Sequence, residues 1–104
     1  MGSVRERPER LAEKLLQIRT SLGLSQSEML RHLGLDEKSY RHYISNYETG
    51  KREPTLLVLL EYARAVNVYV DALIDDELDL PDKLPSRTRH EGIRRAPQAR
   101  SKKR

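Results

Sequence analysis

Three glycines divide the first half of the chain into short segments whose apolar residues recur at helical spacing. They are Gly23, Gly34 and Gly50. In the first segment the steps between apolar residues are four and three, which is typical of one face of an amphipathic helix. Those residues are Leu11, Leu15, Ile18 and Leu22. Glycine readily adopts the left-handed conformation that ends many helices, so each glycine predicts a helix end. No strictly alternating strand pattern accompanies them, and we expect an all-α fold.

Capping residues predict where the later helices begin. Ser25 and Glu28 have the spacing of a capping box, in which each side chain accepts a hydrogen bond from the backbone of the other residue. Thr55 predicts the start of another helix, and Asn67 its left-handed end. The expected core stripe of that helix is Leu56, Leu59, Leu60, Ala63 and Val66. A last short helix near residues 70–74 is expected to bury Val70, Leu73 and Ile74.

Five short helices over roughly 70 residues predict one compact all-α domain with a modest core. The acids and prolines after the last helix indicate an extended linker. The final residues have almost no apolar side chains and indicate a disordered tail. The predicted organisation is a flexible N-terminus over 1–7, a helical domain over 8–76, an acidic and proline-containing linker over 77–86 and a basic tail over 87–104.

The net charge of +4 conceals two oppositely charged regions. Residues 1–86 hold 12 Lys and Arg against 15 Asp and Glu, whereas residues 87–104 hold eight basic residues and one acid. Such a tail either binds phosphate or only aids solubility. The six acids within residues 71–82 either contact a protein partner or the tail, or lie in a solvated linker.

A capped helix that ends at a glycine, followed by a connection and a short helix with outward polar residues, is the plan of a helix-turn-helix. The stretches GLSQSEMLRHLG, ISNYETGKREPTLLVLLEYARAVNV and VDALI resemble the Xre/Cro-type, lambda-repressor-like family of bacterial DNA-binding proteins. The resemblance covers about Leu11 to Ile74. It implies a five-helix domain that binds double-stranded DNA sequence-specifically and regulates transcription, which we expect to be repression.

The short helix that ends near Tyr47 carries the predicted base-reading surface. Ile44 and Tyr47 are three residues apart and predict its buried side, so the polar residues between them and one turn earlier should face outward. Arginine can pair with guanine and asparagine with adenine, and the resemblance implies base reading at the same positions. The candidates are Arg41, His42, Ser45 and Asn46.

A second group of residues is expected to contact the DNA backbone. The resemblance implies that Gln26 holds a phosphate and that the loop after the reading helix grips another. Without the surrounding motif, the cations of that loop would indicate only a solvated surface. Tyr43, like Tyr40, either bonds a phosphate through its hydroxyl or covers the turn. The phosphate candidates are Gln26, Tyr43, Thr49, Gly50, Lys51 and Arg52.

Glu48 is an unexpected residue for a surface that meets phosphate, because like charges repel. The resemblance implies that Glu48 forms a structural ion pair with Arg19 beneath the DNA-binding surface. We therefore assign neither residue to base reading.

The connection from Gln26 to Ile44 is about four residues longer than the usual spacing of the family, which corresponds to one helical turn. Either Asp36 starts the reading helix early, or Ser39 caps it after a longer turn. Ser39 is favoured, because acids at a helix tip in the groove would repel phosphate.

The expected assembly is a homodimer on a two-fold-related operator. Leu57 and Val58 stand at positions that are often polar in the family, and they either form a dimer contact or pack against residues 78–81. The alternative function is that of an antitoxin-like or accessory protein whose main role is to bind a protein partner.

An enzyme is not expected, because the sequence has no cysteine and no recognisable zinc, phosphate-loop or nucleophile motif. We predict no cofactor, no metal and no catalytic residue. The sequence has no secretion signal and no apolar run of membrane-spanning length, so we expect a cytoplasmic, nucleoid-associated bacterial protein without membrane contact.

Overall fold

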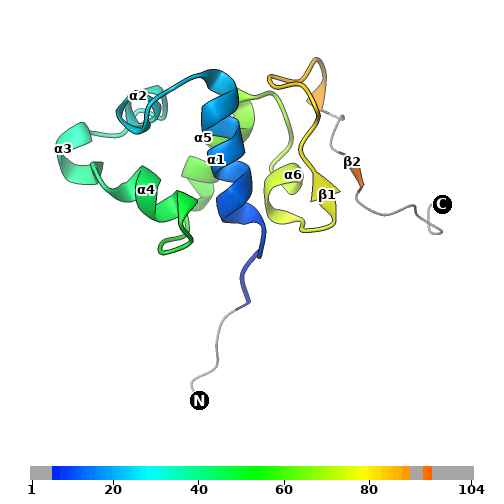
Figure 1. Ribbon diagram of the computed structural model, residues 1–104, viewed down its shortest axis with the longest axis horizontal. Helices are drawn as coiled ribbons and strands as arrows, with labels where there is room; N and C mark the ends of the chain where they lie inside the picture. Colours follow the sequence, from blue (N-terminus) through cyan, green and yellow to red (C-terminus); the bar gives the residue numbers. More distant parts are fainter. Residues whose placement is uncertain (1–5, 90–92, 95–104) are drawn as a thin grey trace.

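The structure is a computed structural model that describes residues 6–89 and 93–94. Within these residues it has six helices and one antiparallel pair of two-residue strands (Figure 1). The helices are α1 (Leu11–Leu22), α2 (Gln26–His32), α3 (Glu37–Tyr40), α4 (Tyr43–Glu48), α5 (Leu56–Ala65) and α6 (Asp71–Ile74). The strands are β1 (Leu78–Asp79) and β2 (Ile93–Arg94). The predicted all-α class is confirmed; most of the predicted N-terminal segment and basic tail lie outside the described residues.

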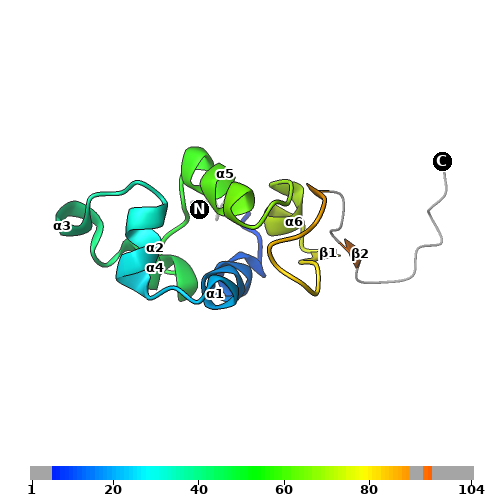
Figure 2. The same cartoon turned by 90° about the horizontal axis from the view of Figure 1, so that it is seen from above.

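The five predicted helices correspond to α1, α2, α4, α5 and α6, and α3 is an additional single turn. Helix α1 lies in the middle of the molecule and contacts α4 on one side and α6 on the other (Figures 1 and 2). Helices α2, α3 and α4 form one end of the molecule, and α6 with β1 forms the opposite end. The two ends are therefore joined through α1 and α5.

Local hydrogen bonds begin and end the helices as the sequence predicts. The Ser25 hydroxyl accepts from the Glu28 amide at 3.1 Å, and the Glu28 carboxylate accepts from the Ser25 amide at 2.7 Å, so the predicted capping box is confirmed. This second bond lowers the pKa of Glu28, because it stabilises the ionised carboxylate. Thr55 caps α5 in the same manner. Asn67 has the predicted left-handed backbone, with a φ of 59°.

The core takes buried residues from every helix except α3. On α5 the buried residues are Leu59, Tyr62 and Ala63, and Val66 directly after the helix is buried as well. Tyr62 is fully buried, although the predicted stripe did not include it. Successive residues of a helix are rotated by about 100° about its axis. The buried side of α5 therefore faces the direction of Tyr62, and Leu56 lies at the edge of that side. Leu56 is accordingly 82% exposed, and its predicted burial is wrong.

Helix α6 also differs in part from the prediction. Leu73 is fully buried and Val70 is half-buried, but Ile74 is 43% exposed. Ala72 and Leu73 form the buried side of this single turn, so Ile74, its last residue, projects away from the core.

Residues 77–86, which were expected to form an extended linker, pack against the helices. Leu80 is 5% exposed and Ser86 is also 5% exposed. The Ser86 amide donates to the Val66 carbonyl at 2.8 Å, and the Asn67 side-chain amide donates to the Ser86 carbonyl at 2.8 Å. This segment continues the fold beyond α6.

Two cations at the start of α1 hold the beginning of that segment, Arg10 directly before the helix and Lys14 within it, and we call this arrangement the C-terminal clamp. The Lys14 ammonium is buried and donates to the carbonyls of Ala72, Asp75 and Leu78 at 2.8, 2.9 and 2.8 Å. The Arg10 guanidinium donates to the Asp76 and Leu78 carbonyls and to the Asp79 carboxylate. Burial lowers the pKa of Lys14, because it disfavours the charged form.

Candidate nucleic-acid interface

Helix α4 is fixed through its buried side, which leaves two polar side chains for a ligand. Ile44 is fully buried and Tyr47 is 3% exposed, while Ser45 and Asn46 between them are half-buried on the other side. Within the described residues neither the Ser45 hydroxyl nor the Asn46 side-chain amide makes a hydrogen bond. Both side chains therefore keep their full capacity to bind a ligand.

Arg41 and His42 do not share the helical surface that was predicted for all four base-reading candidates. Helix α4 begins at Tyr43, so His42 directly precedes the helix and Arg41 follows α3. Both side chains are exposed. The prediction placed them one turn earlier on the same helix as Ser45 and Asn46, and the additional turn α3 makes that placement wrong.

The additional turn also settles how the extra residues fold. The Asp36 carboxylate accepts from the Ser39 amide at 2.9 Å and caps α3, a separate turn. Helix α4 has no side-chain cap at its start. The favoured prediction of Ser39 as the cap of the reading helix is therefore wrong, and so is the alternative in which Asp36 lengthens that helix, because Asp36 instead starts an independent helical turn.

An ion pair joins α1 to the end of α4. The Arg19 Nε and Nη2 atoms donate to the two Glu48 carboxylate oxygens at 2.6 and 3.0 Å. The Arg19 and Glu48 side chains are only 16% and 5% exposed. The bond to Glu48 raises the pKa of Arg19, because the carboxylate stabilises the guanidinium charge. This is the pair that the resemblance implied, and it lies beneath the surface.

Gln26, a phosphate candidate, contacts the same carboxylate. Its Nε2 atom donates to Glu48 Oε1 at 3.2 Å, which connects the first residue of α2 to the last residue of α4. A side-chain amide has two N–H donors, so one remains for a ligand. Gln26 thus helps to set the position of the two helices as well as offering a donor at the surface.

The loop after α4 has two exposed cations, one of which is stacked on an aromatic ring. Gly50 has a φ of 80°, which turns the chain away from α4, and Lys51 is exposed. The Arg52 guanidinium lies 4.0 Å from the centre of the Tyr43 ring. The Thr49 hydroxyl donates to the Ser45 carbonyl at 2.9 Å, so it acts on the end of its own helix.

Tyr43 is part of a row of aromatic rings. Its ring contacts Tyr40 edge-on at a centroid distance of 4.6 Å and Tyr47 at 6.0 Å. Together with the stacked Arg52, these contacts make Tyr43 a cover for the turn between α3 and α4. A role of its hydroxyl at phosphate stays a prediction.

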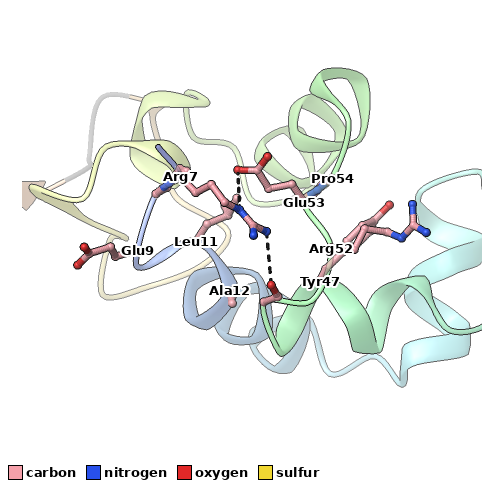
Figure 3. A pocket seen from close by; sticks show the side chains of 10 residues that line it. Arg7, Glu9, Leu11, Ala12, Tyr47, Arg52, Glu53 and Pro54 are labelled. Atoms are coloured by element: carbon pink, nitrogen blue, oxygen red, sulfur yellow. Dashed lines mark hydrogen bonds and ion pairs between the residues drawn. The ribbon is translucent and has the colours of Figure 1, made fainter. Parts of the chain in front are cut away.

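Arg7 lies beside this loop, although no pattern in the sequence indicated a role for it. Its Nη2 atom donates to the Gly50 carbonyl at 3.4 Å and its Nε atom lies 3.5 Å from the Glu53 carboxylate (Figure 3). The side chain crosses a pocket of about 280 Å³ between the segment before α1 and the loop before α5. Arg7 therefore connects the N-terminal segment to the phosphate-candidate loop.

The two dimer candidates have different surroundings. Leu57 is 73% exposed, and it therefore does not pack against residues 78–81. Val58 is half-buried and packs against the core. Leu57 and the adjacent Leu56 together form an exposed apolar pair at the start of α5.

A comparison with protein families matches residues 12–78 to the helix-turn-helix domain. The chain belongs to the helix-turn-helix domain family. The matched range runs from α1 to the first residue of β1 and therefore includes most of the C-terminal clamp. This helix-turn-helix chain is also 37% identical, over 62 residues, to the SPbeta prophage-derived uncharacterized HTH-type transcriptional regulator YonR of Bacillus subtilis (strain 168). The match covers 60% of the chain but only about half, 54%, of that relative. No solved structure matches the chain.

Across residues 6–89 no group of three or more His, Cys, Asp or Glu side chains is arranged to hold a metal ion. None of the helices in the described part of the chain has the length and apolar character needed to cross a membrane.

Proposed function

We propose that this helix-turn-helix protein binds double-stranded DNA sequence-specifically and represses transcription, with α4 in the major groove. The observation that carries the proposal is that the side chains of Ser45 and Asn46 project from α4 without a hydrogen bond to any described side chain or backbone group. The other side of this helix is held by Ile44, Tyr47 and Glu48. A rigid helix with unsatisfied polar side chains is suited to reading base edges. The name of the Bacillus subtilis relative, a transcriptional regulator, supports the same proposal.

Within this proposal the residues divide into two roles. Asn46 pairs with adenine, and Ser45 with a neighbouring base edge, while Lys51 and the free donor of Gln26 hold phosphates on the two sides of α4. His42 directly precedes α4 and is the third base-reading candidate. The motifs of the reading helix and its loop support placement in the Xre/Cro-type group of helix-turn-helix proteins.

The proposed assembly is a homodimer, and the exposed pair Leu56 and Leu57 is its proposed contact. Leucines this exposed are unfavourable on a monomer in water, and a second copy would cover them. A dimer would also place two copies of α4 on two half-sites.

The proposal is tested by selection from a randomised duplex pool with the full-length protein, at a salt concentration high enough to weaken contacts with phosphate alone. We expect enrichment of a two-fold-symmetric motif. The matched control is the double variant S45A/N46A, which should remain folded and enrich no motif. If the wild-type protein also enriches none, the proposal is wrong, and binding of a protein partner through the start of α5 becomes the better explanation of the exposed leucines.

A further inference from the structure

The additional turn α3 creates a groove against α2. We call it the α2–α3 groove and define it by its lining residues, which are Ser27, Leu30, Glu37, Lys38 and Arg41. Its volume is about 270 Å³. Leu30 forms its buried floor, while the other four residues are exposed.

The charges of this groove suit an anion. Lys38 and Arg41 make no hydrogen bond or ion pair with any other described residue, so both positive charges are available. The one acid of the groove, Glu37, is neutralised by Arg31, whose Nη1 atom donates to the Glu37 carboxylate. The Ser27 hydroxyl adds a neutral donor. The groove therefore combines two unpaired cations with a hydroxyl.

Helix α3 is held in place although it buries none of its residues. Asp36 caps its start, and the Tyr40 ring packs against Tyr43 of α4. The bond from Arg31 to Glu37 connects it to α2 as well. Tyr40 is half-buried and packs against the core, while the other three residues of α3 are exposed and free to contact a ligand.

The groove is continuous with the proposed DNA-binding surface. Ser27 directly follows Gln26, and Arg41 is two residues before α4. Both views place α3 beyond α2 and α4 at one end of the molecule, far from α6 and β1 (Figures 1 and 2). A duplex that lies along α4 would extend past this end.

We propose that the α2–α3 groove binds a phosphate of the DNA backbone through Lys38, Arg41 and Ser27, an inference that rests on the proposed DNA binding. It assigns Arg41 to phosphate rather than to a base. It also gives the additional turn a function, because α3 extends the contact with DNA beyond the helix-turn-helix itself. Phosphate contacts position a protein on DNA without selecting a sequence.

The test is the salt dependence of binding to a random-sequence duplex, measured by fluorescence anisotropy with the full-length protein. The logarithm of affinity should fall less steeply with the logarithm of salt concentration in Lys38→Gln, by about one unit of slope. Arg41→Gln should behave in the same way and should weaken binding to the selected site and to random DNA by the same factor. Glu37→Gln should tighten random-sequence binding, because it removes the carboxylate that compensates Arg31 and leaves the charge of that cation available for phosphate.

The matched control is Lys83→Gln, which removes an exposed lysine from the segment after β1. Strand β1 lies at the end of the molecule opposite α3 (Figure 1). Its slope should equal that of the wild-type protein. An unchanged slope in Lys38→Gln, together with a reduced slope in Lys51→Gln, would overturn the groove and leave the proposed function standing. A loss of sequence preference in Arg41→Gln would overturn the phosphate role of Arg41. If the wild-type protein binds no duplex at all, the proposed function itself is wrong.

Discussion

The cations at the two ends of this molecule have different surroundings. In the C-terminal clamp, Arg10 and Lys14 direct their donors to backbone carbonyls and carboxylates of residues 72–79. At the other end, Lys38, Arg41 and Lys51 are exposed, and none of them has a hydrogen bond or ion pair with another described residue. The clamp has two cations and the opposite end three, all of them lysines or arginines. What distinguishes them is whether the chain itself supplies the acceptor.

This difference shows that positive charge alone does not indicate a nucleic-acid surface. A buried ammonium needs acceptors from the protein, and the carbonyls of Ala72, Asp75 and Leu78, from α6 to β1, supply them for Lys14. An exposed ammonium is hydrated by water and needs no acceptor from the protein. When it binds a DNA phosphate, it displaces counterions that were condensed on the DNA. The cations of the clamp should therefore affect stability, whereas the exposed cations at the α4 end should affect binding.

The largest effect is expected at the clamp, from Lys14→Met. Methionine keeps the apolar stem but removes the donors, so three carbonyls lose their partner and the free energy of unfolding should fall by about 4 kcal/mol. Urea denaturation measures this change. The control Lys83→Met, at an exposed position, should change it by less than about 0.5 kcal/mol. A similarly small change for Lys14→Met would contradict a structural role of the clamp.

Glu48→Ala should have the next largest effect, because it removes the partner of a largely buried Arg19. We expect a loss of about 3 kcal/mol in the free energy of unfolding, since the guanidinium charge is left without compensation. Glu48→Gln keeps an acceptor and should lose less. In a double-mutant cycle, Arg19→Ala should be less damaging in the Glu48→Ala background than in the wild-type protein; additive losses would argue against coupling.

Asn46→Ala should change binding but not folding. Preference for the best site should fall by about 1–3 kcal/mol, because two hydrogen bonds to a base are lost, while affinity for random DNA should stay nearly the same. Parallel titrations of the two duplexes measure the difference. Lys51→Gln is the comparison variant, and it should weaken binding to both duplexes equally. An equal loss in Asn46→Ala would remove its base-reading role.

The smallest effect is expected from Tyr62→Phe. The Tyr62 hydroxyl is buried without a hydrogen-bond partner among the described residues, and burial raises its pKa well above that of an ordinary tyrosine. Removing the hydroxyl should raise the free energy of unfolding by about 1 kcal/mol, because an unsatisfied polar group leaves the core. Thermal and urea denaturation should agree. A loss of stability would indicate that the hydroxyl has an acceptor after all.

Features that depend on neighbouring residues were predictable from the sequence. The capping box of Ser25 and Glu28, the cap at Thr55 and the left-handed Asn67 each follow from side chains and backbone groups within a few residues of one another. Periodicity likewise predicted the burial of Leu11, Leu15 and Ile18 in α1, although the fourth predicted residue, Leu22, is only half-buried. The contact between Arg19 and Glu48 was implied by a family resemblance and not by local pattern.

Features that depend on distant segments were not predictable. No local pattern distinguishes Lys14 from the other charged residues of α1, and its acceptors lie about sixty residues further along the chain. Leu56 matches the apolar spacing of α5, yet its exposure depends on which side of that helix the rest of the domain covers. Arg7 gave no signal, because its contacts with Gly50 and Glu53 exist only after the chain has folded.

By itself, the sequence determined that this chain is helical, where most of its helices begin and end, and which short helix presents Ser45 and Asn46. The tertiary structure alone decided that the extra residues before α4 form a separate turn, that residues 77–86 pack onto the domain, and which cations remain exposed. Helix caps and periodicity act over one or two turns, whereas the burial of a charge depends on whether acceptors from elsewhere in the chain reach it. Here the carbonyls of residues 72–78 reach Lys14, and no acceptor from the described chain reaches Lys38.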